Sequence, residues 1–382
     1  MPSELSFVPQ FEPSDTASNA KHVLVFFIPG NPGLIDYYEP FLSTLYTLLN
    51  EPPRGSWGSP VYVQVYGRNL AGFDDAEHEP FDKKNPPYDL EYQIRYTINS
   101  LAALRVHAEG PQKGTPFDMT ILVGHSIGAF IALEIFHRLL QSNNKFFSAN
   151  ASDLTTTGHF EETTVVNPHP TAGILLFPAI THLAHSPSGR WLELVRTTPA
   201  LDTAAQIVVR FLPTILNYFV SDRFLHWLLR LRGVSEPEHA AATTCRLLRS
   251  RDGLWQVLHL GKDEMRVVVG DGSERWADEL WQVAETESPK TRPEARNADV
   301  EDVPKFFIYF KKHDHWVADE WRDRFIEKRN EHARRKGPRH KRGRTRIILD
   351  SDNIPHAFCI KRSETMAEKV RVWINEIVVA NF

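Results

Sequence analysis

A chain of 382 residues with 42% hydrophobic and 24% charged residues has an ordinary globular composition, and its net charge of −4 argues against a general nucleic-acid binder. Its two cysteines form no Cys-x-x-Cys pair, and no His/Cys cluster has zinc spacing. Neither a disulfide framework nor a structural metal is therefore expected, and a reducing compartment is favoured. The polar first twenty residues lack a signal-peptide core, and no apolar run is long enough to predict a membrane-spanning helix.

The first elements along the chain indicate a mainly parallel sheet. Residues 1–20 are expected to form a flexible leader, and residues 21–382 a single domain. Residues 23–28 are a continuous apolar run of strand length that Pro29 to Gly33 ends abruptly. Continuous apolarity is typical of a strand buried on both faces, as in a parallel sheet. Residues 61–66 predict the next strand.

A Gly-x-Ser-x-Gly turn follows the third predicted strand. The apolar run Ile121 to Val123 leads into Gly124-His125-Ser126-Ile127-Gly128, and apolar residues at helical spacing come next. In α/β-hydrolases such a strand–turn–helix holds its serine in a strained conformation with the hydroxyl exposed above the sheet. A serine in an ordinary loop is the alternative interpretation. The order of elements up to this point fits the first half of an α/β-hydrolase.

The loop from Pro29 to Gly33 is a candidate for half of an oxyanion hole. In the hydrolase fold one backbone N–H comes from the loop after this strand, and the other from the residue after the nucleophile. By position these donors are Asn31 and Ile127. From the loop alone, a plain turn is an equally good interpretation.

Residues 191–260 depart from the alternation of strands and helices and predict a helical cap insertion. Within it, residues 203–232 are mostly apolar, with a narrow polar stripe at helical spacing and Pro213 as an expected kink or break. The stripe consists of Gln206, Arg210, Thr214, Asn217 and Ser221. One interpretation is a cap over the active site that buries its apolar faces internally. The other is an amphipathic segment lying in a lipid surface, with Phe211, Phe219, Phe224, Trp227 and Leu228 inserted, and both can hold together.

The remaining chain supplies an acid and a histidine in the order that the fold requires. A serine hydroxyl needs a base within hydrogen-bond reach and a group that orients the base. His356 lies in the loop after the last predicted strand, 346–350. Asp314 follows the strand 306–310 and is the preferred acid. Asp271 and Asp302 are the alternatives.

A Lys/Arg-rich stretch, residues 327–346, is predicted to be a basic insertion. A solvated helix end and loop is its first interpretation. Contact with anionic lipid headgroups is the second.

Four blocks of sequence resemble the lipid droplet-associated hydrolase family. They are Ile28-Pro29-Gly30-Asn31-Pro32-Gly33-Leu34, Gly124-His125-Ser126-Ile127-Gly128-Ala129, Leu176-Phe177-Pro178-Ala179-Ile180 with Ser186-Pro187-Ser188-Gly189, and Asn353-Ile354-Pro355-His356-Ala357-Phe358. The resemblance implies an α/β-hydrolase fold with Ser126 as nucleophile, His356 as base and Asp314 as acid, and it disfavours Asp271. It also implies hydrolysis of neutral lipid esters, notably sterol esters, without a metal or cofactor. The expected location is the surface of lipid droplets and the cytosolic face of the endoplasmic reticulum.

Two features depart from the family pattern. Lys311 stands where the family usually has a glycine shortly before the acid, which puts the geometry of that turn in question. The stretches 142–165 and 327–346 also look longer than in the family. A droplet-bound structural protein with little turnover is therefore one alternative function. A thioesterase or acyltransferase using the same triad is another.

Overall fold

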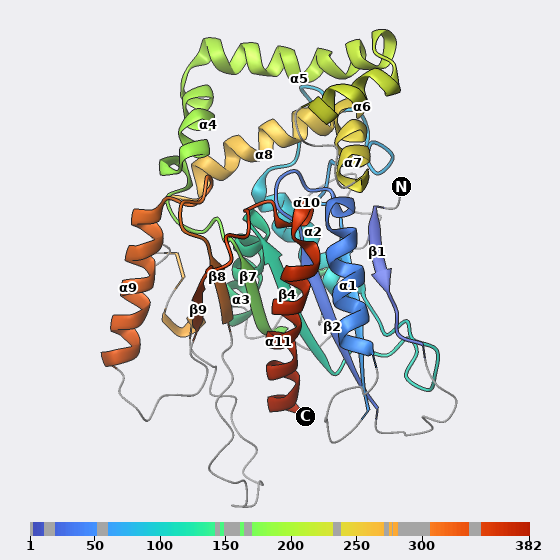
Figure 1. Cartoon of the computed structure of the whole chain (residues 1–382), viewed down its shortest axis with the longest axis vertical. Coiled ribbons are helices and arrows are strands. Elements are labelled where there is room, and N and C mark those ends of the chain that lie inside the picture. The colour runs from blue at the N-terminus through green and yellow to red at the C-terminus, as the bar shows by residue number, and fades with distance from the viewer. Residues whose placement is uncertain are drawn as a thin grey trace, which may run out of the picture.

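A computed structural model of the chain describes residues 3–10, 20–51, 60–141, 146–148, 161–163, 170–231, 238–270, 275–276, 278–281, 306–335 and 345–382. Among them, a seven-stranded sheet has the strand order β1-β3-β2-β4-β7-β8-β9 (Figure 1). Its strands are β1 (Glu4–Phe7), β2 (Lys21–Ile28), β3 (Val61–Arg68), β4 (Met119–His125), β7 (Pro170–Leu176), β8 (Phe306–Phe310) and β9 (Arg346–Leu349). All neighbours pair in parallel except β1 and β3. A separate antiparallel pair joins β5 (Phe146–Ser148) to β6 (Glu161–Thr163).

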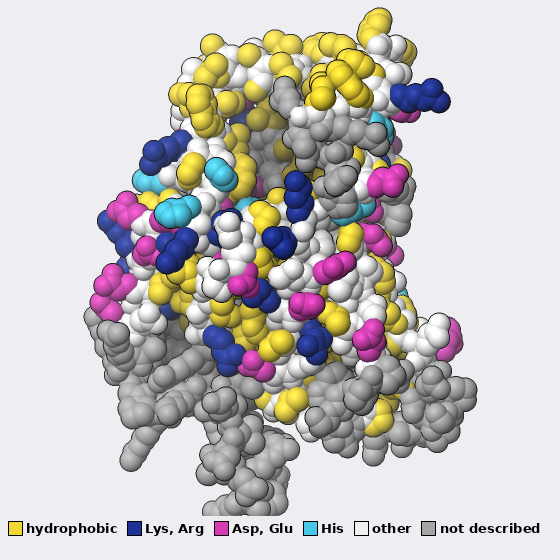
Figure 2. Space-filling view, viewed as in Figure 1, with side chains coloured by type: hydrophobic (Ala, Val, Ile, Leu, Met, Phe, Trp, Pro, Cys, Tyr) yellow, Lys and Arg dark blue, Asp and Glu magenta, His cyan; other side chains and the backbone are white. Residues whose placement is uncertain are grey.

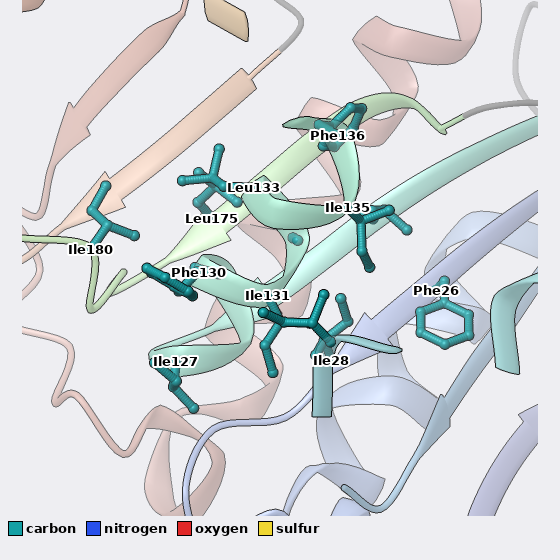
Figure 3. Packing of buried hydrophobic residues seen from close by; sticks show 14 of the residues in the cluster. Phe26, Ile28, Ile127, Phe130, Ile131, Leu133, Ile135, Phe136, Leu175 and Ile180 are labelled. Carbon is teal, nitrogen blue, oxygen red and sulfur yellow. The ribbon is translucent and has the colours of Figure 1, made fainter. Parts of the chain in front are cut away.

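Helices cover both faces of the sheet, and each face has its own hydrophobic core. The helices α1 (Glu39–Asn50) and α11 (Ser363–Asn381) pack on one face, and α2 (Leu90–Ala103) and α3 (Ile127–Gln141) on the other. Strand β2 alternates between the two cores, with Phe26 facing α3 and Phe27 facing α1, which explains its unbroken apolar sequence. Figure 3 shows Phe130 and Ile131 of α3 in the same core as Phe26 and Ile28 of β2. The predicted α/β-hydrolase fold, with a mostly parallel sheet flanked by helices, is confirmed.

The first strand differs from the expectation of a flexible leader over residues 1–20. Glu4–Phe7 form β1 at the edge of the sheet, where they pair antiparallel with β3. Tyr66 of β3 also donates a hydrogen bond of 2.6 Å from its hydroxyl to the Glu4 carboxylate. This pairing depends on a partner more than fifty residues further along the chain, so the local composition carries no sign of it. Residues 11–19 of the leader lie outside the described part.

Five helices form a cap between β7 and β8: α4 (Pro187–Thr197), α5 (Pro199–Phe219), α6 (Asp222–Leu231), α7 (Glu238–Arg249) and α8 (Gly253–Val267). They run from residue 187 to residue 267 and so include the predicted insertion 191–260. In space they lie above the edge at which the parallel strands end (Figure 1). Helix α5 continues through Pro213 without the expected break, and the proline is the buried residue of that helix. Among the described helices, none combines the length and apolarity needed to cross a membrane.

Four short helices and the longer helix α9 complete the described chain. They are η1 (Ile35–Tyr38), η3 (Leu183–His185), η4 (Asp278–Trp281), α9 (Asp319–Arg335) and α10 (Phe358–Lys361). The predicted basic insertion 327–346 begins inside α9 and ends in β9, and its central residues 336–344 lie outside the described part.

Candidate active site

Ser126 lies in a sharp turn between β4 and α3, with a backbone φ of 53°. A positive φ is costly for serine, and such strain is typical of a nucleophile elbow. The flanking glycines make the turn possible, because a Cβ on Gly128 would lie 2.2 Å from the Ile28 carbonyl oxygen and one on Gly124 would lie 2.4 Å from the Gly128 oxygen. The turn predicted from Gly-x-Ser-x-Gly therefore brings α3 directly against β2.

The structure brings Ser126, His356 and Asp314 together from three separate loops. His356 Nε2 lies 3.0 Å from Ser126 Oγ, and His356 Nδ1 lies 2.8 Å from Asp314 Oδ2. Asp314 is buried, and the backbone N–H of Trp316 donates to its other oxygen at 2.8 Å. Since a carboxylate only accepts hydrogen bonds, Nδ1 carries the proton and Nε2 is free to accept from the serine. This arrangement can deprotonate the hydroxyl as it attacks a carbonyl carbon.

The turn before Asp314 forms despite Lys311. Arg322 of α9 donates a hydrogen bond of 2.8 Å to the Lys311 carbonyl, and its guanidinium is buried beside Asp319. His313 adopts a φ of 53°, and its N–H donates to Asp319. Arg322 thus holds the acid loop from outside it, a role that sequence reasoning missed. The alternative acids Asp271 and Asp302 lie outside the described residues.

His125 and Tyr38 link the loops that carry Ser126 and His356. The Tyr38 hydroxyl lies 2.7 Å from His125 Nδ1, and His125 Nε2 lies 2.9 Å from the backbone carbonyl of His356. Burial, with the nearby His356, holds the pKa of His125 well below its usual range, so the ring is neutral. A carbonyl can only accept, so Nε2–H donates to His356 and Nδ1 accepts from Tyr38. The N–H of Gly30 in turn donates to the tyrosine hydroxyl at 3.1 Å.

This network was not identified from the sequence. The sequence signals were the histidine inside Gly-His-Ser-Ile-Gly and the tyrosine pair that follows the Pro-Gly-Asn-Pro-Gly loop. Neither pattern shows that the two side chains meet.

The two predicted oxyanion donors lie beside the serine. Ile127 is the first residue of α3, where backbone N–H groups have no partner within the helix. Asn31 follows β2 in the loop that packs on the nucleophile turn, since a Cβ on Gly30 would lie 3.2 Å from the Cβ of Ser126. Neither N–H makes a hydrogen bond to a residue that the structure describes. Both N–H groups are therefore unpaired within the part of the chain that the structure describes.

One group of side chains in the described residues has metal-ligating chemistry: Asp75, His78 and Asp252, whose ligand atoms lie within 4.8 Å of one another. Both carboxylates and His78 Nδ1 are already hydrogen-bonded, whereas His78 Nε2 is buried and has no partner among the described residues. Ser250 Oγ donates to Asp75 at 2.9 Å, Arg251 Nε donates to Asp252 at 2.7 Å, and His78 Nδ1 lies 2.8 Å from a backbone carbonyl, to which it must donate. The cluster therefore fits a hydrogen-bonded connection between the cap and the β3–α2 loop better than a metal site.

The outer face of the cap is apolar. Figure 2 shows hydrophobic side chains gathered over the helices at the top of the molecule. The five residues predicted to insert into lipid are all exposed, from 40% for Leu228 to 83% for Phe219, with Phe211, Phe224 and Trp227 between them. Members of the polar stripe instead contact other cap helices: Arg210 stacks over Trp255 at 3.6 Å, and Asn217 donates to the Arg249 carbonyl at 3.0 Å. Helix α5 is thus amphipathic with its apolar side outward.

Comparisons with known proteins give a consistent family. The family model described as lipid-droplet associated hydrolase matches residues 21–359. The lipid droplet-associated hydrolase of Rattus norvegicus is 27% identical over 377 residues, which cover 94% of this chain and 86% of the rat protein. That of Gallus gallus is 27% identical over 261 residues, which cover 67% of this chain and 65% of the chicken protein.

Solved structures resemble the chain more distantly. A juvenile hormone epoxide hydrolase from Bombyx mori matches with a TM-score of 0.46 and 13% identity, covering 98% of this chain and 72% of that chain. The peroxisomal α/β-hydrolase Lpx1 from Saccharomyces cerevisiae matches with a TM-score of 0.47 and 12% identity, covering 94% and 78%.

Proposed function

The chain belongs to the lipid droplet-associated hydrolase family, and from this premise we propose that it hydrolyses neutral lipid esters, either sterol esters or acylglycerols, at the surface of lipid droplets. The observation that carries the proposal is the hydrogen-bonded series Ser126, His356 and Asp314 beneath a cap with an apolar outer face. The second location that we propose is the cytosolic face of the endoplasmic reticulum membrane.

In the proposed mechanism, His356 accepts the proton of Ser126 as Oγ attacks the ester carbonyl. The backbone N–H groups of Asn31 and Ile127 stabilise the negative charge that forms on the carbonyl oxygen. His356 then gives the proton to the leaving alcohol, and the acyl group stays on the serine. Water, deprotonated by His356, attacks the acyl-enzyme and releases the fatty acid. Asp314 keeps His356 in the required tautomer throughout, and no metal or cofactor takes part in these steps.

The substrate class is tested by a series of esters of increasing acyl length on purified protein, with and without an emulsified lipid interface. We expect measurable turnover of long-chain cholesteryl or glyceryl esters, increased by the interface. The same panel includes an acyl thioester and an acyl-acceptor alcohol, which test the thioesterase and acyltransferase alternatives. Turnover of the thioester alone would contradict the proposal. Absence of turnover on every substrate would favour the structural protein with little activity.

The outer face of the cap is proposed to dock on the lipid monolayer. Replacing Phe219 and Trp227, which are 83% and 51% exposed, by glutamate is expected to weaken binding to phospholipid-coated triacylglycerol emulsions by at least about 10-fold, since each large side chain gains roughly 1.5–3 kcal/mol on burial. Flotation of the emulsion with bound protein measures the effect. The matched control replaces Val372 and Val379 of α11, which are 46% and 60% exposed on another part of the surface, by glutamate. Equal binding of the two double variants would exclude the cap as the docking face.

A further inference from the structure

The cap holds the proposed oxyanion loop through one side chain. The Nδ2 atom of Asn31 donates two hydrogen bonds of 3.1 Å, both to α8: one to the Val257 carbonyl and one to the Glu264 carboxyl oxygen Oε1. These contacts join residues 226 and 233 positions apart in the sequence. The position of Asn31 therefore depends on the cap as well as on β2.

Glu264 is a buried acid, 5% exposed, that forms no ion pair with a cation of the described chain. Burial is the main cause that raises its pKa to about 8. The hydrogen bond from Asn31 works in the opposite direction, and the charge of Asp263 adds to the rise. The two cations nearest in sequence are engaged elsewhere, because Lys262 pairs with Asp202 of α5 and Arg266 pairs with Asp263. Glu264 is therefore mostly neutral at neutral pH.

Charged and titratable groups around α8 are few in the described structure. On α8 itself they are His259, Lys262, Asp263 and Arg266. The neighbouring α5 contributes Asp202 and Arg210, and Asp89 lies at the start of α2. Asp263 accepts hydrogen bonds from Arg266 and from the N–H of Leu90. Among these groups only Asp263 contributes charge to the ionisation of Glu264.

A neutral carboxyl group is chemically complementary to the Asn31 amide. Each has one donor side and one acceptor side, whereas a carboxylate has acceptors only. The Oδ1 atom of Asn31 is buried and has no donor among the residues that the structure describes. Loss of the proton from Glu264 would add a negative charge beside this loop, where the Asn31 Oδ1 acceptor already has no donor.

We propose that Glu264 is a positioning residue of the reaction, which holds Asn31 from the cap helix α8 so that the Asn31 backbone N–H faces the oxyanion. The inference rests on the proposed function in taking Ser126 as nucleophile and Asn31 as oxyanion donor, and it is independent of which ester is the substrate. Glu264 does not touch the reacting atoms. It acts through Asn31, and only its neutral form supports the reaction, because a carboxylate at this place opposes the charge that forms on the substrate oxygen.

The test measures how fast a soluble alkyl fluorophosphonate labels Ser126 between about pH 6 and about pH 9.5. As Ser126 Oγ displaces fluoride, negative charge builds up on the phosphoryl oxygen in the transition state, as it does on an ester carbonyl oxygen, and the reaction needs no lipid substrate. The wild-type rate is expected to fall as the pH rises through about 8, where Glu264 ionises. Glu264→Gln keeps the acceptor for Asn31 and cannot ionise, so its rate at pH 7 stays within about 3-fold of wild type and the alkaline loss disappears. Glu264→Leu loses the acceptor and labels about 10- to 100-fold more slowly at every pH.

A matched control is Glu134→Gln. Glu134 is also buried, at 3% exposed, but its hydrogen bonds go to Arg275 and Trp276 rather than to the oxyanion loop. This variant is expected to keep the alkaline loss of the wild type. An alkaline loss in Glu264→Gln equal to that of the wild type would overturn the proposal, and so would an unchanged labelling rate in Glu264→Leu.

Thermal unfolding provides a readout that keeps the test decisive if Glu264→Leu fails to fold. The folded pKa of about 8 lies above the ordinary 4.5, so the wild type progressively loses stability relative to Glu264→Gln as the pH rises from 4.5 to about 8. Glu264→Gln is therefore expected to melt at an increasingly higher temperature than the wild type as the pH rises across this range. A constant difference would contradict the assigned ionisation. Failure of the proposed function is distinguishable, because lipid-ester turnover would then be absent while labelling of Ser126 still followed Glu264.

Discussion

Ser126→Ala is expected to lower kcat for lipid esters by about 10⁶-fold, the loss typical of removing the nucleophile from a serine triad. His356 would then have no hydroxyl to deprotonate at 3.0 Å, and no acyl-enzyme could form. The variant should also lose all labelling by a fluorophosphonate probe. Steady-state turnover and labelling followed by mass spectrometry of the peptide containing residue 126 measure the two effects.

The folded state of this variant should be nearly unchanged, which separates catalysis from stability. Alanine at a φ of 53° carries the same backbone strain as serine, whereas glycine relieves it, so Ser126→Gly should melt at a higher temperature than Ser126→Ala while both are inactive. Ser43→Ala serves as a control, because this hydroxyl on α1 donates only to the local carbonyl of Pro40. Labelling that persists in Ser126→Ala would show that another residue is the nucleophile.

Asp314→Asn is expected to lower kcat by about 10⁴-fold with little change in KM, as in other triads that lose only the carboxylate charge. The Asn amide can donate to His356 Nδ1, which moves the imidazole proton to Nε2, and that nitrogen can then no longer accept from Ser126 at 3.0 Å. The N–H of Trp316 still has an oxygen to bind, so the loop should keep its shape. Initial rates over a range of substrate concentrations separate kcat from KM.

The control for this prediction is Asp323→Asn on α9. Asp323 is 62% exposed and pairs with Arg322, the residue that holds the turn at Lys311. It should keep wild-type kcat, because Arg322 retains Asp319 as a second partner. A kcat for Asp314→Asn within about 10-fold of wild type would instead point to a different acid, and Asp271 and Asp302 are the alternatives from the sequence.

The strands and turns that carry the three residues of the proposed triad could be predicted, because each has a local sequence signal and they follow one another in the order that the fold requires. Buried parallel strands are continuous apolar runs, and the residues that matter follow those strands directly. Ser126, Asp314 and His356 could therefore be selected without knowing any contact. The departure at Lys311 could not be judged in this way, since the support for that turn comes from Arg322 on the next helix.

Contacts between distant segments explain what could not be predicted. Glu264 meets Asn31 across 233 positions of sequence, and β1 pairs with β3 through backbone hydrogen bonds that carry no local pattern. The periodicity of residues 203–232 predicted a polar stripe on apolar helices, but not which side faces the protein. The contacts of Arg210 and Asn217 place the stripe against the other cap helices and leave the apolar side outward.

The two ends of the cap insertion meet directly after β7. The N–H of His182 donates to the Gly270 carbonyl at 3.0 Å, and the N–H of Leu183 donates to that of Val268 at 3.2 Å. The two ends of the cap therefore come together at one stalk, and hydrogen bonds of Asn31 and Asp75 tie the cap to the body at further places. Because the entropic cost of closing a loop rises only with the logarithm of its length, doubling the length of the insertion adds only roughly 0.6 kcal/mol of closure entropy. The stalk thus allows the cap to change in length while the strands before and after it keep their register.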